Sequence, residues 1–164
     1  MSITATKNKR LLKSPLNYTG GKYKILNQIL PLFPKNINQF VDLFAGGGNV
    51  GINIDAKKVY FNDNLIYLVK MFLEFKNLGF DNTLKYINEK ISQYQLSQTN
   101  EEGYLEFRKK YNQDRNPLDL FVLIAYSFNH QIRFNNSHEY NNSYGRNRSS
   151  FNENMKLNLY HFIA

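Results

Sequence analysis

The sequence predicts an α/β fold in which a short parallel sheet is followed by a mostly helical region. Residues 39–44 and 58–62 are two β-prone runs, and the first leads directly into a glycine-rich turn. Apolar residues then recur at helical spacing over 65–78 and again over 81–110. Two such strands joined by a helical crossover are typical of a parallel βαβ unit, to which a helical lobe is added.

The first expected element is a basic flexible arm at residues 1–14, which ends at the Ser14-Pro15 break. A short helix follows at 24–32, where apolar side chains stand four residues apart, and Pro34 ends it. The segment 49–54 is expected to open the crossover helix. The remaining elements are a strand at 58–62, a helix at 65–78, a helical lobe at 81–110, a buried helix at 118–128, a hairpin or long loop at 129–151 and a final helix at 154–164.

Composition limits the class of protein. The chain has 164 residues, 42% of them hydrophobic, which is enough for one buried core. It has no cysteine, so disulfides and thiolate metal sites are excluded, and we expect no metal. No run approaches the roughly 20 apolar residues that span a bilayer, and the N-terminus lacks an apolar signal core. We therefore expect a cytoplasmic protein without a membrane partner.

The charge distribution favours a polyanionic partner. The net charge is +8, and residues 1–41 contain seven Lys or Arg and no acidic residue. Basic side chains placed on phosphates release condensed counterions, which strengthens binding to nucleic acids. A basic surface that is only solvated is the alternative, because charge alone does not identify a ligand.

The segment Phe40-Val-Asp-Leu-Phe-Ala-Gly-Gly-Gly48 carries the clearest chemical signal. A strand that ends in an acid, an aromatic residue and a glycine turn lets the backbone approach an adenosine-containing cofactor closely. The spacing differs from the dinucleotide fingerprint, and a phosphate-binding loop would need Gly-Lys-Ser/Thr after the turn. S-adenosylmethionine (SAM) is therefore favoured over NAD or ATP, and a glycine turn without a ligand is the alternative.

Two further positions fit the same ligand. Asp63 ends the second strand, where a carboxylate can accept hydrogen bonds from ribose hydroxyls, although an Asp there also commonly caps the next helix. Upstream, Asn17-Tyr-Thr-Gly-Gly-Lys22 combines a glycine turn with an aromatic ring and a cation. Lys22 would pair with the methionine carboxylate and Tyr18 would pack beside it; a tight turn that opens the next helix is the alternative.

Together these motifs resemble the Dam-type DNA adenine N6-methyltransferases, in particular the phage enzymes of the T-even group. The resemblance rests on Tyr18-Thr-Gly-Gly-Lys22, the segment 40–48 and Phe61-Asn-Asp63. It continues through Arg115-Asn-Pro-Leu-Asp119, Phe128-Asn-His-Gln-Ile-Arg-Phe-Asn135, Tyr140, Tyr144-Gly-Arg146 and Tyr160-His-Phe162. It implies a partial SAM-dependent methyltransferase core, Rossmann-like, with an inserted helical DNA-recognition lobe and a β-hairpin.

The resemblance also assigns residues to roles. The implied cofactor-binding residues are Tyr18, Gly20, Lys22, Asp42, Phe44, Ala45, Gly46 and Asp63. The implied DNA-binding residues are Phe128, Asn129, Gln131, Arg133, Asn135, Tyr144, Arg146 and Arg148. The chain divides into the arm at 1–14, the SAM-binding part of the core at 15–78, a target-recognition lobe at 79–152 and the start of a return to the core at 153–164.

Within the DNA-reading segment 128–148, Phe128, Asn129 and Gln131 match positions that enter the base stack. Arg133 matches an arginine that reads a guanine edge, because its fork satisfies guanine O6 and N7 together. A phosphate contact or a surface ion pair is the alternative for Arg133. Two positions depart from the family pattern: Ser143 stands where proline is common, and Asn147 replaces a bulky or basic residue. GATC recognition does not follow from this segment.

In the family, the target adenine is flipped out of the duplex, and an Asp-Pro-Pro-Tyr element accepts hydrogen bonds from its amine and stacks on it. No such tetrapeptide occurs here, and Asn116-Pro-Leu-Asp119 lacks both the second proline and the aromatic ring. We expect the catalytic element after Ala164, so the 164 residues are expected to bind without efficient methyl transfer.

The expected partners are double-stranded DNA and either a complementing C-terminal chain or a second copy, in a bacterial or phage-encoded protein that serves restriction–modification. A non-catalytic SAM- and DNA-binding subunit or remnant is one alternative. A nucleotide-dependent oxidoreductase is the other, and it would bind NAD at Asp63.

Overall fold

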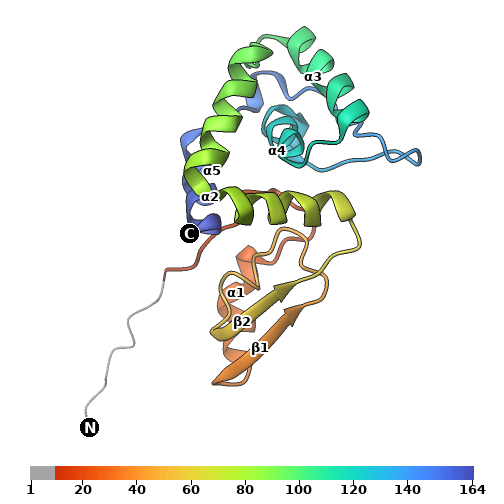
Figure 1. Cartoon of the computed structure of the whole chain (residues 1–164). Coiled ribbons are helices and arrows are strands. Elements are labelled where there is room, and N and C mark those ends of the chain that lie inside the picture. The colour runs from red at the N-terminus through yellow and green to blue at the C-terminus, as the bar shows by residue number, and fades with distance from the viewer. Residues whose placement is uncertain (1–9) are drawn as a thin grey trace.

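The computed structural model describes residues 10–164, so most of the expected arm at 1–14 lies outside the described residues. The strands are β1 (Ile37–Asp42) and β2 (Ala56–Phe61). The α-helices are α1 (Leu26–Ile29), α2 (Ile66–Gln93), α3 (Glu101–Asp114), α4 (Pro117–Tyr126) and α5 (Glu153–Ile163). Figure 1 shows the sheet and α1 on one side of the first half of α2, with the other helices on the opposite side.

The two strands form a parallel pair, as expected. Ile37 lies opposite Ala56 and Asp42 lies opposite Phe61, so both strands end at the same edge. The helical segment expected at 24–32 is present as α1 between two 3₁₀ turns, Tyr23–Ile25 and Leu30–Leu32. The parallel sheet therefore places the residues that follow β1 and β2 side by side.

The prediction of a crossover helix at 49–54 was wrong, because this segment forms successive turns. The side chain of Asn53 accepts a hydrogen bond from the Leu12 N–H and donates one to the Leu12 carbonyl, each at 2.8 Å. The Oδ1 of Asn49 accepts from the Ser14 N–H at 3.0 Å. Asparagine side chains that bond backbone groups in this way compete with helix formation, and here they hold residues 12–14 against the turns between β1 and β2.

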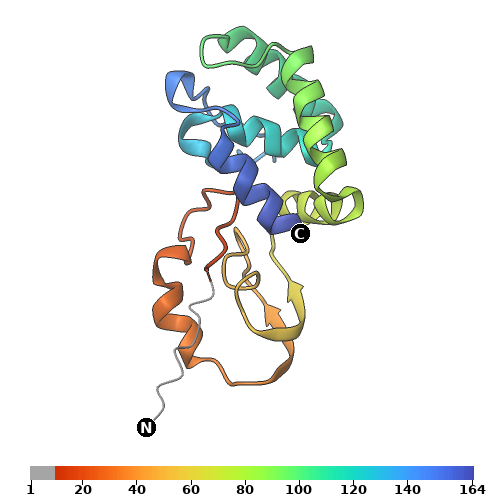
Figure 2. The ribbon, with the colours of Figure 1, turned by 90° about the vertical axis from the view of Figure 1, so that its left-hand side faces the viewer.

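Helix α2 bends at Gly79. This residue has φ 72° and ψ 177°, a conformation that only glycine adopts readily, and helix continues on both sides of it. The change of direction is visible in Figure 1 and Figure 2. The bend lies beside the expected boundary between 78 and 79, and the division into domains itself stays a prediction.

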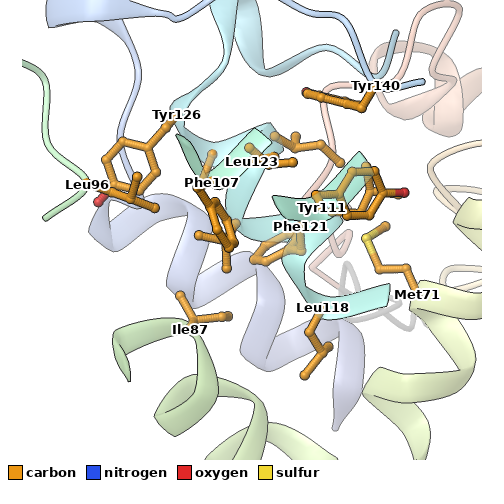
Figure 3. Close-up of a cluster of buried hydrophobic side chains, with 14 of the residues drawn as sticks. Met71, Ile87, Leu96, Phe107, Tyr111, Leu118, Phe121, Leu123, Tyr126 and Tyr140 are labelled. Atoms are coloured by element: carbon orange, nitrogen blue, oxygen red, sulfur yellow. The ribbon is translucent and has the colours of Figure 1, made fainter. Parts of the chain in front are cut away.

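The core lies around α4, which was expected to be buried. Every side chain from Leu118 to Tyr126 is at most 5% exposed. The ring of Phe121 meets that of Phe75 from α2 edge to face, with 5.2 Å between centroids. Figure 3 shows side chains of α2, α3 and α4, among them Ile87 and Phe107, gathered in one cluster. Helix α5 packs against α2 and completes this layer.

The segment 127–151 is an extended loop that folds back on itself. Single antiparallel bridges join Ser127 to Tyr144 and Phe134 to Tyr140, and 3₁₀ turns occupy Phe128–His130 and Arg146–Arg148. It is therefore hairpin-like, without paired strands. Among residues 10–164, no helix combines the length and apolar character needed to cross a membrane.

Candidate functional site

A cavity of about 410 Å³ lies at the edge where β1 and β2 end. All eight expected cofactor-binding residues line it: Tyr18, Gly20, Lys22, Asp42, Phe44, Ala45, Gly46 and Asp63. Sequence reasoning missed six others: Thr19, Gly21, Gly47, Asn49, Val50 and Asn64. These six residues lie within or close to the sequence motifs, and that position was the only feature of the sequence that could have identified them. The volume is within the roughly 300–1,000 Å³ of small-molecule sites.

Asp63 connects the two strand ends. Its Oδ2 accepts a hydrogen bond from the Gly46 N–H at 2.9 Å, and its Oδ1 accepts one from the Leu65 N–H at 2.9 Å. The second bond stabilises the turn into α2, so the helix-start alternative is structurally present. A carboxylate has about four acceptor positions, so these two bonds leave acceptor capacity on Asp63 for a ligand hydroxyl.

Asp42 holds the glycine turn from the other side. Its Oδ2 accepts a hydrogen bond from the Gly51 N–H at 3.1 Å. Burial raises the pKa of the Asp42 carboxyl, the bond from Gly51 opposes that shift, and the negative charge of Asp63 adds to it. Gly51 is required here, because a Cβ at this position would lie 2.4 Å from Cε1 of Phe61.

The ring of Tyr18 covers the glycine turn. A Cβ at Gly46 would lie 2.9 Å from Cδ1 of Tyr18, and Gly46 has φ +49°. Burial, and then the charge of Asp63, raise the pKa of the Tyr18 phenol, which keeps its hydroxyl protonated. Two turns that are distant in sequence are thus packed directly against each other.

The cavity carries both signs of charge and one exposed ring. The Nζ of Lys22 donates to the Gly20 carbonyl at 2.8 Å and is exposed to solvent. The side chain of Phe44 is 82% exposed at the turn after β1. One cation, two carboxylates and an apolar ring suit a ligand that has its own charged ends and an aromatic base.

The expected DNA-reading segment begins next to this cavity. Phe128 is 44% exposed. Asn129 and His130 have φ of 54° and 52°, which turns the chain sharply after α4. The Nδ2 of Asn17 donates to the Asn129 carbonyl at 2.8 Å, so the residue before Tyr18 anchors this turn.

Four other expected DNA-binding side chains lie on the surface: Gln131, Arg133, Arg146 and Arg148. Arg146 pairs with Glu101 at 3.2 Å.

Two expected DNA-binding residues have structural partners instead. Tyr144 is 7% exposed, and its hydroxyl donates to the Ser97 carbonyl at 2.6 Å. The Oδ1 of Asn135 accepts from the N–H groups of Ser137 and Glu139, at 3.0 and 2.8 Å. This geometry favours packing for Tyr144 and turn formation for Asn135.

Comparison with known proteins identifies the family. The family model of the D12 class N6 adenine-specific DNA methyltransferases matches residues 18–164. Modification methylase StsI of Streptococcus sanguinis is 56% identical over 163 residues, which are 99% of this chain and 25% of that protein. Type II methyltransferase M.FokI of Planomicrobium okeanokoites is 50% identical over 157 residues, 96% of this chain and 24% of that protein. A DNA adenine methylase of Vibrio cholerae is 27% identical over 120 residues, 73% of this chain and 41% of that protein.

This chain spans about a quarter of the length of the first two relatives. The special likeness to phage enzymes stays a prediction. The family uses S-adenosylmethionine as its cofactor. In the part of the chain that the structure describes, no group of three or more His, Asp or Glu side chains is placed to hold a metal ion. On the match over residues 18–164, this chain belongs to the D12 class of N6 adenine-specific DNA methyltransferases.

Proposed function

We propose that this chain provides the cofactor-binding and DNA-reading part of a site-specific DNA adenine N6-methyltransferase that acts in the cytoplasm. The observation that carries the proposal is the single cavity lined by all eight residues that the sequence motifs select. Those motifs are separated by up to 45 positions, from Tyr18 to Asp63, yet they meet at the ends of β1 and β2.

The residues of the cavity fit S-adenosylmethionine. Asp63 would accept hydrogen bonds from the ribose hydroxyls, and Lys22 would pair with the methionine carboxylate. Gly46 has φ +49° and no side chain, so the Tyr18 ring packs directly on the turn that the nucleoside would contact. The bound cofactor supplies the methyl group on a sulfonium centre.

Double-stranded DNA is the proposed macromolecular substrate. Phe128, Asn129 and Gln131 would contact or enter the base stack at the turn that Asn17 anchors. Arg133 would read a guanine edge, while Arg146 and Arg148 would contact phosphates. Tyr144 would support this surface from within the protein, and Asn135 would shape the turn at the tip of the loop.

We further propose that these 164 residues alone bind both ligands but transfer the methyl group poorly. They contain no Asp-Pro-Pro-Tyr element, and the acceptors and stacking ring that place an adenine amine in line with the methyl group are therefore missing. The matched relatives are about four times as long. The alternative is a non-catalytic SAM- and DNA-binding subunit or remnant. It would bind the same two ligands, but no complementing chain would restore methyl transfer to it.

The sheet supports a role for additional protein. Val41, Leu43 and Leu73 are 56%, 54% and 52% exposed, next to a two-stranded sheet whose outer edges are unpaired within residues 10–164. Exposed apolar side chains beside an open strand edge favour association. A complementing C-terminal chain or a second copy would cover them, and light scattering of the purified chain distinguishes a monomer from a self-associated form.

Calorimetric titration tests the central proposal. The chain should bind S-adenosylmethionine or S-adenosylhomocysteine with a saturable heat and should give none with NAD. Saturable binding of NAD in place of the sulfonium nucleoside would support an oxidoreductase. Labelled methyl transfer to duplex DNA by the isolated chain would refute the proposal that the catalytic element is missing.

A further inference from the structure

Tyr67 connects the start of α2 to the DNA-reading segment. It lies in the first turn of α2, four positions after Asp63, and it is half-buried. Its ring stacks on that of Phe134, with 4.6 Å between centroids and 19° between planes. Phe134 directly follows Arg133, the side chain proposed to read a base. A residue close to the cofactor cavity therefore contacts the neighbour of a base-reading arginine.

The loop that carries Arg133 is a closed unit. The Asn141 N–H donates to the Arg133 carbonyl at 3.0 Å, and Phe134 forms an antiparallel bridge with Tyr140. At the tip, the Asn135 N–H donates to the Glu139 carbonyl at 2.9 Å. A displacement of Phe134 would therefore move residues 133–141 together.

The C-terminal end of α3 and the residue after it also hold this loop. The Nη1 of Arg115 donates to the His138 carbonyl, with 2.6 Å between the two atoms. The Cζ of Arg115 also lies 5.6 Å from the centroid of the Tyr67 ring. The side chain of Asn112 exchanges two hydrogen bonds with the backbone of Tyr140. Tyr67 thus supplies the contact from α2, while Asn112 of α3 and Arg115, directly after α3, supply the hydrogen bonds.

We propose that Tyr67 is a positioning residue for sequence recognition: its ring sets the orientation of the 133–141 loop and thereby of the Arg133 side chain. The inference rests on the proposed function, because it assumes that Arg133 reads a base. A flat ring is needed for a nearly parallel stack, so phenylalanine can replace Tyr67 and an aliphatic side chain cannot. An arginine must meet guanine O6 and N7 together, so a small rotation of the loop is enough to lose discrimination.

The experiment uses the full 164-residue chain and duplex DNA. A randomised duplex library first selects the sequence that the wild type prefers, in the presence of S-adenosylhomocysteine. Fluorescence anisotropy then gives the affinity ratio between the selected duplex and a duplex with one substituted guanine. Tyr67→Leu and Tyr67→Ala should lower this ratio about tenfold, within the range of one bidentate arginine contact. Tyr67→Phe should keep the ratio within twofold.

Two controls separate positioning from folding. Tyr60→Ala removes a partly exposed ring from β2 and should leave the ratio unchanged, and calorimetry should show S-adenosylhomocysteine binding within twofold of wild type for every Tyr67 variant. Phe134→Leu should cause the same loss as Tyr67→Leu, and the double variant should add nothing. If Tyr67→Ala does not fold, Tyr67→Leu decides alone.

The possible outcomes distinguish a failure of the Tyr67 role from a failure of the proposed function. If the wild type selects a sequence and Tyr67→Leu retains the full ratio, the positioning role is wrong while the proposed function stands. An equal fall of the affinity ratio in Tyr67→Phe and Tyr67→Leu would also overturn the positioning role. If the wild type binds S-adenosylhomocysteine but selects no sequence, DNA reading by this chain is wrong and the inference is lost with it.

Discussion

The N–H of Gly46 donates a hydrogen bond of 2.9 Å to Oδ2 of Asp63, so the turn after β1 is attached directly to the turn after β2. The other oxygen of Asp63 accepts from the Leu65 N–H at the start of α2. One carboxylate therefore shapes the cavity and begins the helix. The structural and ligand-binding readings of Asp63 are compatible, and substitutions can separate them.

Asp63→Ala should weaken binding of S-adenosylmethionine at least tenfold and lower the free energy of unfolding. Two part-buried N–H groups lose their acceptor, each at a cost of about 1–3 kcal/mol. Asp63→Asn keeps one acceptor oxygen, so it should lose less of the wild-type stability than of the wild-type affinity for S-adenosylmethionine. Calorimetry and urea unfolding followed by circular dichroism measure both effects. Asp55→Ala, at an exposed acid outside the cavity, should change neither; unchanged cofactor affinity in Asp63→Ala would remove Asp63 from the ligand site.

Gly46→Ala should destabilise the chain more than Gly20→Ala does. Both positions have positive φ, which costs an L-residue about 1–2 kcal/mol. A Cβ at Gly46 would also lie 2.9 Å from the Tyr18 ring, whereas a Cβ at Gly20 meets nothing within 4 Å. Urea unfolding of the two variants isolates the contact with Tyr18. Equal losses of stability would show that the Tyr18 ring moves aside freely.

The cofactor cavity is the part of this protein that the sequence predicts best, because strand ends and glycine turns are encoded locally. Asp42 ends the first strand, Gly46 and Asp63 follow the two strands, and parallel pairing brings them together. The DNA-reading segment is predicted less completely, since the burial of Tyr144 depends on Ser97, which is distant in sequence. The prediction of a crossover helix at 49–54 was wrong for the same reason. The side chains of Asn49 and Asn53 bond the backbone of the N-terminal segment, and a contact between segments so far apart in sequence leaves no local pattern.

Asp119→Asn should flatten the dependence of stability on pH. Asp119 is 4% exposed and accepts from the Tyr86 hydroxyl at 2.8 Å. Burial raises the pKa of the Asp119 carboxyl, and the bond from Tyr86 only partly opposes that shift. A raised pKa in the folded state means that the neutral acid is favoured there. Its contribution to stability is therefore complete below the unfolded pKa of about 3.9 and is lost as pH rises through the folded value.

Asparagine stays neutral and keeps an acceptor for Tyr86, so Asp119→Asn should gain stability relative to wild type as pH rises from 3 to 7. Urea unfolding at several pH values, followed by circular dichroism because the chain has no tryptophan, measures this difference. A difference that shrinks as pH rises would mean that the charged carboxylate is favoured at this site, for instance by the N-terminal end of α4.

Arg133→Ala and Arg148→Ala should weaken DNA binding in different ways, although both side chains are exposed and equally charged. Loss of a base contact lowers discrimination by about 1–3 kcal/mol and leaves affinity for unrelated duplexes largely intact. Loss of a phosphate contact lowers affinity for every sequence and reduces the salt slope by about one. Anisotropy titrations on selected and scrambled duplexes at several salt concentrations separate the two. If Arg133→Ala weakens all duplexes equally and shifts the slope, Arg133 contacts phosphate, and base reading belongs to other side chains of the 128–148 segment.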